Sequence, residues 1–241
     1  MDNCVHHLIF VVLVLSLVFV PSSAYALQQA GGTQDPGPEI MMPGQFTQVL
    51  KEVWTFLKGE TENYLASIER KDEFETAVEF ERKVTDSRRQ YLAKVIKYSR
   101  DQKLDQRVFG VLFKASLESY DADKQLYTVS SSTVVDAPYN IPTVQCVIRR
   151  NSYVYLADSI RAGYRTSSLY VRLPSGTKWQ VSRDLAKAAK TEEPSIYFRA
   201  NVKIDIEKAD FKDKAILELV PVELAFLNNA SDQVYWAVPI R

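Results

Sequence analysis

The hydrophobic period of this 241-residue chain changes once, near residue 107. Before this point, apolar residues recur at three- and four-residue steps over 46–68 and again over 80–98, as in an amphipathic helix. After it, apolar and polar residues alternate, most clearly over 196–206, IYFRANVKIDI, as in an antiparallel strand with one buried face. The chain is therefore predicted to be an α+β protein, with N-terminal helices followed by a mainly antiparallel β-sheet domain that includes one short helix.

A cluster of glutamates opens the second predicted helix, in the segment KDEFETAVEFERKV (71–84). Thr76 lies three residues before Glu79, which forms a T-x-x-E capping box, and Glu79 lies four residues before Lys83 in the favourable order. Catalytic carboxylate pairs usually come from separate elements that face each other. We therefore interpret the cluster as the start of a capped helix that runs to about residue 106, rather than as an active site.

This second helix is expected to cover the sheet with one apolar stripe. The predicted stripe consists of Phe80, Val84, Tyr91, Val95 and Tyr98. In the first helix, Gly59 is expected to break or kink the chain, because glycine weakens a helix. The helical region is assigned to residues 44–107 and the mainly antiparallel β-domain to residues 108–241.

Turn signals divide the predicted β-domain into strands. The segment SYDADKQLYTV (119–129) predicts a β-hairpin with Asp121 and Asp123 as turn residues, since a calcium loop needs more oxygen donors. Pro221 predicts a sheet edge or a bulge, and Ser182 is expected to cap a short helix over 182–190. The remaining predicted strands cover 143–156, 168–173, 196–206, 215–227 and 234–238.

Two of these segments carry a resemblance. EFETAVEFERKV followed by YDADKQLYTV, with a later Ala- and Lys-rich helix and a long alternating strand, resembles a recurring layout in exported bacterial proteins of unassigned function. The resemblance covers about residues 70–210. It implies an envelope protein with an α+β fold, and it implies no activity and no catalytic or ligand residues.

The first 26 residues have the layout of a secretory signal peptide. Residues 8–20, LIFVVLVLSLVFV, carry no charge, and Ala24-Tyr25-Ala26 forms a small-x-small cleavage site. Cleavage after Ala26 predicts a periplasmic or secreted protein with a flexible leader over 27–43 and no further membrane span. An uncleaved N-terminal membrane anchor is the alternative, since no Lys or Arg precedes the apolar run.

Signal cleavage would remove most of the residue types used for catalysis and metal binding. His6, His7 and Cys4 would leave with the signal, so that Cys146 is the one cysteine of the mature chain. This composition excludes histidine-based triads, histidine-based metal sites and an internal disulfide in that chain. Cys146 is expected to be a buried, inert thiol, with an intermolecular disulfide as the alternative.

No cofactor and no nucleic acid are predicted as ligands. Glycines are not grouped after residue 60, which argues against phosphate-binding loops. The mature chain would hold 30 basic and 29 acidic residues, a net charge of +1 that does not point to nucleic acid.

The sequence is locally basic over 145–200, where seven Arg and three Lys face four acids, a net charge of +6. Arg beside aromatic residues is typical of binding surfaces. The candidate partner-binding residues are Arg149, Arg150, Arg161, Arg165, Arg172, Tyr153, Tyr155, Tyr164 and Tyr170. The expected partner is an envelope protein or an anionic glycan or polymer. Alternatively, this region pairs within the molecule with residues 60–86, which hold nine acids and four bases.

Two hypotheses of function follow. The first is a non-catalytic binding or scaffolding protein of the cell envelope. The second is an envelope enzyme that uses carboxylates alone on glycans, since carboxylate pairs need no histidine. No catalytic pair is identified in the sequence.

Overall fold

The computed structural model describes residues 37–138, 144–161, 164–173, 177–206 and 215–241, and the side chains of 159–166 and 215 lie outside this description. The described residues belong to one compact unit. The predicted signal peptide and the predicted leader up to residue 36 lie outside the described residues. Helices and strands both build the unit, so the predicted α+β class is confirmed.

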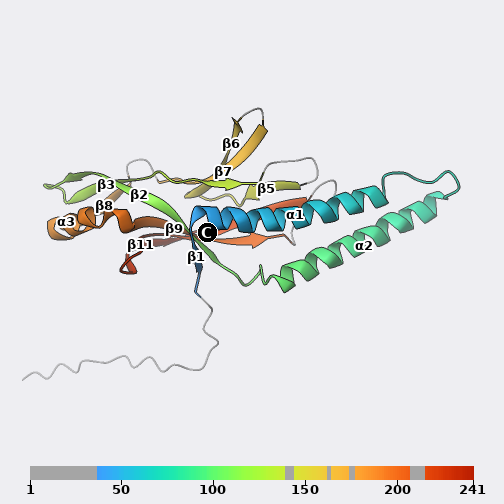
Figure 1. Cartoon of the computed structure of the whole chain (residues 1–241), viewed down its shortest axis with the longest axis horizontal. Coiled ribbons are helices and arrows are strands. Elements are labelled where there is room, and N and C mark those ends of the chain that lie inside the picture. Colours follow the sequence, from blue (N-terminus) through green and yellow to red (C-terminus); the bar gives the residue numbers. More distant parts are fainter. Residues whose placement is uncertain (1–36, 139–143, 162–163, 174–176, 207–214) are drawn as a thin grey trace, which may run out of the picture. The chain divides into compact units, whose positions relative to one another are not determined.

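The first helix, α1 (Pro43–Ser67), is the helix that packs on the sheet (Figure 1). Its buried residues repeat at three- and four-residue steps and are Phe46, Leu50, Val53, Leu57 and Thr61. Proline at the first helical position is favourable, because its missing N–H would have no partner there. The helix continues through Gly59, so the predicted break at this residue is wrong.

The second long helix, α2 (Ala77–Asp101), packs along α1, and the prediction that it covers the sheet is wrong. Of its predicted stripe, Tyr91 and Val95 are buried and Tyr98 is half-buried. Phe80 and Val84 are half-exposed and lie outside the core. The reason is that the first half of α2 lies beside the far part of α1, beyond the strands (Figure 1).

The end of α2 is also earlier than predicted, at Asp101 instead of residue 106. The N–H of Lys103 donates to the carbonyl of Arg100 and the N–H of Leu104 to that of Ser99. Lys103 has a φ of 51°. These two bonds and the left-handed residue form a Schellman motif, and burial of Leu104 adds its usual hydrophobic contact.

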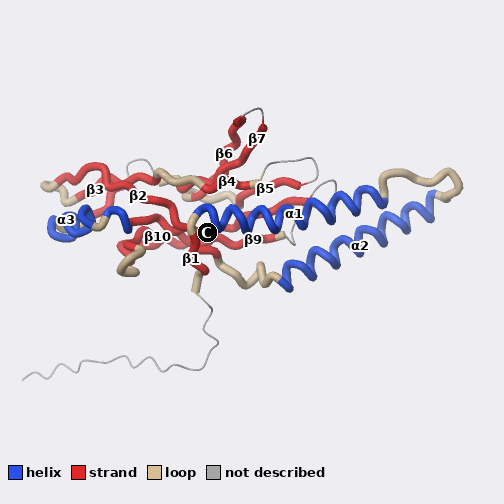
Figure 2. The backbone as a smooth tube through the Cα atoms, viewed as in Figure 1, coloured by secondary structure: helices blue, strands red, loops and turns tan. Residues whose placement is uncertain are grey.

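The larger sheet is mixed and has eight strands (Figure 2). Its strand order is β11-β10-β9-β2-β3-β8, with β1 beside β2 and β5 beside β10. The β1–β2 and β5–β10 pairs are parallel and the other pairs are antiparallel. The strands are β1 (Glu39–Met41), β2 (Phe109–Asp121), β3 (Leu126–Ser131), β5 (Val144–Ile148), β8 (Lys178–Gln180), β9 (Ile196–Asp205), β10 (Ala215–Asn228) and β11 (Gln233–Pro239).

A smaller antiparallel sheet contains β4 (Val135–Ala137), β7 (Tyr164–Val171) and β6 (Val154–Arg161), in that order. The strand predicted over 143–156 is therefore divided between two sheets. Asn151 causes the division, because its side chain binds four backbone groups of the residues around it, two as donor and two as acceptor. Such local bonds replace the ladder of a continuous strand.

Two local predictions in the strands are confirmed. β2 and β3 form the predicted hairpin around Asp121. Pro221 lies at a bulge of β10, where the pairing with β9 shifts register between Pro221 and Glu223. Since β10 has strands on both sides, the proline marks a bulge and not an edge.

The core lies between α1 and the inner face of the larger sheet, and aromatic rings continue it toward β8 and β11. The rings of Phe198 and Phe226 are 4.9 Å apart, and Trp179 meets Phe226 edge-on at 5.2 Å. The helix α3 (Arg183–Thr191) buries Ala186 and Ala189 and is followed by the 3₁₀ turn η1 (Glu193–Ser195). Ser182 precedes α3, but its side chain makes no capping bond, so that detail of the prediction is wrong.

Replacing Gly59 by alanine tests the continuity of α1. A Cβ at residue 59 meets no atom within 4 Å, so alanine adds helix propensity without a clash. We expect Gly59→Ala to raise the free energy of unfolding by about 0.5–1 kcal/mol in urea denaturation. A loss of stability would show that the helix needs glycine there.

Candidate binding surface

Three of the predicted partner-binding residues lie together on the smaller sheet. Tyr155 of β6 is directly opposite Tyr170 of β7, and their rings stack with centroids 5.3 Å apart at 20°. The guanidinium carbon of Arg172 lies 4.5 Å from the centroid of the Tyr155 ring. These three side chains, hereafter the Tyr–Arg cluster, form one continuous aromatic and cationic contact.

Strand alternation explains why these residues meet. Val154 and Leu169 are buried on the inner face of the smaller sheet, so the neighbouring Tyr155 and Tyr170 point to the outer face. Arg172 follows Tyr170 by two residues and therefore shares that face. Its backbone N–H donates to the carbonyl of Tyr153 at 2.5 Å, which fixes the chain just after β7.

Arg172 differs in its ion pairing from the arginines that bind a described carboxylate. Arg172 is exposed, and within the described residues its guanidinium has a ring contact but no ion pair. Stacking of a guanidinium on an aromatic face leaves its N–H edge available for a carboxylate or phosphate. Among the described side chains, Arg172 is thus a cation held on a ring and without an ion-pair partner.

Arg149 is placed elsewhere and is already neutralised. Its guanidinium makes two hydrogen bonds to the Glu218 carboxylate, of 3.2 and 2.8 Å, and lies 3.9 Å from Asp205. The hydrogen bonds to Glu218 raise the pKa of Arg149 above its ordinary value. The neighbouring Arg150 is exposed.

The other predicted residues fall around the same hairpin. Tyr153 is half-buried against the core just before β6. The backbones of Arg161 and Tyr164 pair across β6 and β7, and Arg165 pairs with Ile160. The side chains of Arg161, Tyr164 and Arg165 lie outside the described part of the chain.

The described ion pairs test the alternative that the acidic residues 60–86 pair with the basic residues 145–200. The acidic residues of the helical segment pair with Lys58, Lys94, Lys83 and Arg89, all from α1 or α2. No ion pair between described side chains joins the two regions. Four of the nine acids of 60–86 thus pair within the helical region, and no ion pair between described side chains joins any of the nine to the Tyr–Arg cluster.

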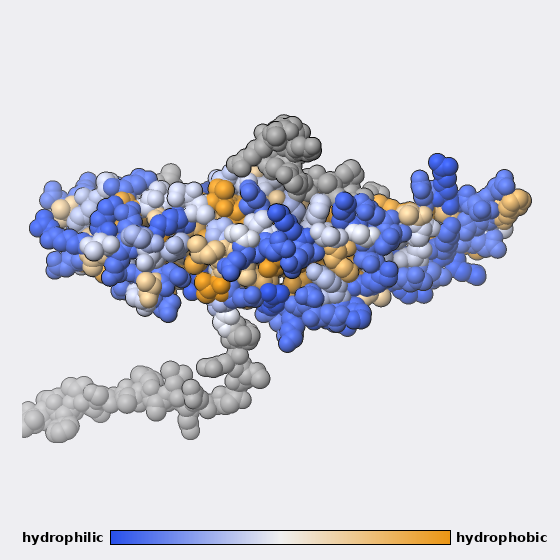
Figure 3. All heavy atoms as spheres, in the orientation of Figure 1, coloured by the Kyte–Doolittle hydropathy of each residue, from blue (hydrophilic) through white to orange (hydrophobic). Residues whose placement is uncertain are grey.

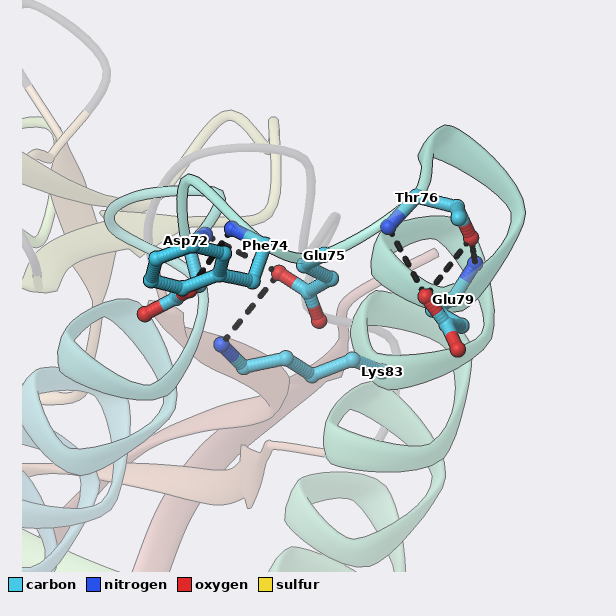
Figure 4. A network of polar contacts seen from close by, with 6 residues as sticks. All are labelled: Asp72, Phe74, Glu75, Thr76, Glu79 and Lys83. Carbon is cyan, nitrogen blue, oxygen red and sulfur yellow. Dashed lines mark hydrogen bonds and ion pairs between the residues drawn. The ribbon is translucent and has the colours of Figure 1, made fainter.

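The glutamate cluster at the start of α2 is a helix cap (Figure 4). The backbone N–H of Glu79 donates to the Thr76 hydroxyl at 3.2 Å, and the backbone N–H of Thr76 donates to the Glu79 carboxylate at 2.8 Å. The bond from the Thr76 backbone is the main reason that the pKa of Glu79 is lowered. Glu75 pairs with Lys83 at 3.9 Å. The predicted capping box is therefore confirmed.

Removal of the cap hydroxyl tests this assignment. Thr76→Ala leaves the first turn of α2 without its side-chain acceptor and is expected to lower the free energy of unfolding by about 1 kcal/mol. Thr85→Ala is the matched control, because that hydroxyl bonds within the helix to the Glu81 carbonyl. Equal losses of stability for the two variants, by thermal or urea unfolding, would contradict the cap.

Glu193 is one of the carboxylates whose pKa is displaced. Glu193 accepts hydrogen bonds from Lys190 at 2.6 Å and from the backbone N–H of Leu117 at 2.7 Å. The Lys190 bond is the largest cause of its lowered pKa. Lys190 also donates to the Leu117 carbonyl, so two side chains bind the residue at which β2 bulges. A general acid needs a raised pKa, so this carboxylate is interpreted as structural.

The Glu193 bonds predict an acid-sensitive stability. The pKa of Glu193 is lower in the folded state than in the unfolded state. Its contribution to the free energy of unfolding is therefore fully present above about pH 4.3 and is lost as the pH falls through the folded-state pKa. Glu193→Gln is expected to cost about 1 kcal/mol at neutral pH, after allowance for solvent screening, and to flatten the pH dependence of unfolding below that range. Glu118→Gln, an exposed neighbour, is the control.

A control that loses as much stability as Glu193→Gln would contradict this role. So would a Glu193→Gln variant whose unfolding curve keeps the full pH dependence of the unmodified protein.

Cys146 and the aspartates of the hairpin have structural settings. Cys146 of β5 is 4% exposed, and burial raises its pKa to about 12, which keeps the thiol protonated and out of reach. Asp121 accepts the backbone N–H groups of Asp123 and Lys124, both at 3.1 Å, as expected for a turn. Within the described residues, no group of three or more His, Cys, Asp or Glu is placed to hold a metal ion.

A small pocket of about 280 Å³ was not predicted from the sequence. Its lining includes Ser99, Asp105, Arg149, Lys203 and Asp205. These residues come from the end of α2, the end of β9 and the segment after β5, so only the folded chain brings them together. Charges of both signs line it, and Arg149 and Asp205 already pair there.

The chain was compared with protein-family models, with curated proteins and with solved structures, and none of them matches. Among the described helices, none is long and apolar enough to cross a membrane.

Proposed function

We propose that this protein is a non-catalytic binding or scaffolding protein exported to the cell envelope, and that its Tyr–Arg cluster binds an acidic glycan. The observation that supports the proposal is the position of Arg172, an exposed cation held on the Tyr155 ring without an ion-pair partner among the described residues. Tyr155 and Tyr170 lie on paired strands, where sites are more rigid than on loops, and Arg172 follows β7 directly and is tied to Tyr153 by its backbone N–H.

The chemistry of the cluster favours an acidic sugar polymer. Aromatic rings provide flat apolar area, which suits the apolar face of a sugar ring. A guanidinium matches a carboxylate or phosphate with two parallel hydrogen bonds. A polymer that carries a sugar ring and an acidic group in adjacent units would contact the tyrosine rings and the Arg172 guanidinium at the same time.

The sequence supports the proposed location. Residues 1–26 have the pattern of a cleaved signal peptide, and the resemblance to exported bacterial proteins favours the envelope. A periplasmic or secreted mature chain is expected to begin at Leu27, which N-terminal sequencing of the purified protein would check. A chain that begins at Met1 would support the anchored alternative.

Charge reversal at the cluster tests ligand binding. Arg172→Glu is expected to weaken binding of a glucuronate-containing oligosaccharide at least about tenfold by titration calorimetry, a loss of about 1.4 kcal/mol. Tyr170→Ala is expected to weaken it as well, by removing the stacked ring. Lys187→Glu on α3 is the matched control, since this lysine is also exposed.

Two results would contradict the proposal. One is an affinity of Arg172→Glu equal to that of the unmodified protein. The other is equal binding of a neutral oligosaccharide of the same length, because the arginine then has no role in selection.

A further inference from the structure

The outer face of the smaller sheet continues past the Tyr–Arg cluster to an exposed carboxylate. Asp136 of β4 lies directly opposite Ser168 of β7 in the strand register. Because the preceding Val135 is buried on the inner face, Asp136 points to the outer face together with Tyr170. The strand order β4-β7-β6 then places Asp136, Tyr170 and Tyr155 on three neighbouring strands of one face.

The Asp136 carboxylate is held in position but is not neutralised. The Ser168 hydroxyl donates to its Oδ1 atom at 3.1 Å, and Ser168 itself is buried, so this bond ties the exposed carboxylate to the sheet. Among the described side chains, none lies at ion-pair distance from Asp136. An ionised carboxylate accepts hydrogen bonds from hydroxyl groups and repels other carboxylates.

The outer face is therefore charged at two separate points. The Arg172 guanidinium lies over the Tyr155 ring of β6, whereas Asp136 lies on β4, two strands away. Along β7, the register places Asp136 two residues from Tyr170. Strand spacing and rise place the two charges roughly 12 Å apart, so neither neutralises the other. The tyrosine rings lie between them.

The polarity of the surface also favours a hydrophilic ligand. Hydrophilic side chains cover most of the face of the molecule seen in Figure 3, and the hydrophobic side chains on it form small separate patches. Large contiguous apolar patches are typical of surfaces that bind protein partners. A glycan, which brings hydroxyl and acidic groups, suits a surface of this kind better.

We propose that Asp136 makes the Tyr–Arg cluster selective for acidic glycans in which charged and uncharged units alternate. This inference rests on the proposed glycan binding. An acidic group binds Arg172, and an uncharged unit of the same chain donates its hydroxyl groups to Asp136. A glycan with an acid on every unit brings a second carboxylate close to Asp136, and like charges about 4 Å apart repel each other even in water.

Titration calorimetry with two octasaccharides tests this selectivity. One alternates glucuronate with N-acetylglucosamine, and the other is a galacturonate oligomer with an acid on every unit. In about 0.15 M salt, which limits long-range attraction, the unmodified protein is expected to bind the alternating chain at least about fivefold more tightly. Asp136→Asn is expected to bring the two affinities within about twofold of each other, because the charge is gone. The Asn amide oxygen still accepts the Ser168 hydroxyl, so the fold is retained.

Asp158→Asn is the matched control. Asp158 accepts a hydrogen bond of 2.7 Å from the hydroxyl of Ser167, whose side chain lies on the opposite face of β7 from that of Ser168. This variant therefore removes an equivalent charge on the other side of the sheet and is expected to keep the preference of the unmodified protein.

The outcomes separate this inference from the proposed function. Equal affinity of the unmodified protein for the two chains would overturn the selectivity and leave glycan binding in place. So would a preference that Asp136→Asn keeps or that Asp158→Asn loses equally. Absence of binding to both chains, or binding that Arg172→Glu does not weaken, would overturn the proposed function and this inference with it.

Discussion

The packing of α1 on the inner face of the larger sheet is the contact on which the rest of the structure depends. Phe46, Leu50, Val53 and Leu57 are almost fully buried there, and full burial of each contributes roughly 1.5–3 kcal/mol. The Phe46 ring lies 5.6 Å from Phe109, at the start of β2. α2 packs on α1, and α1 also contacts β4 of the smaller sheet. Both the helical hairpin and the Tyr–Arg cluster are therefore positioned through this one helix.

Local sequence signals predicted caps, turns and bulges better than they predicted which helices and strands pack together. The Thr76 capping box, the hairpin at Asp121 and the bulge at Pro221 involve neighbouring residues, and all three are present. The sheet-covering helix was assigned wrongly because α1 and α2 both show apolar stripes, and spacing does not reveal which stripe meets the strands. The parallel pair of β5 with β10 joins residues about seventy positions apart and leaves no local pattern.

The candidate site was predicted in part. Tyr155, Tyr170 and Arg172 were named for their composition, and strand register brings them together. Arg149 was named for the same reason, but its pairing with Glu218 depends on the distant strand β10. The partial exposure of Phe80 and Val84 on α2 was missed because both were taken as core residues. Composition thus indicates a surface, while tertiary contacts decide which of its charges are free.

Hydrogen exchange along α1 in about 1 M salt, where exposed charges are screened, would test the central role of this helix most directly. Amides of residues 47–57 are expected to exchange only through global unfolding, because this part of α1 packs on the sheet. Amides of residues 62–67 are predicted to exchange through local opening with a smaller free energy, because no described residue beyond Thr61 in α1 is buried. Equal protection along the whole helix would contradict the account.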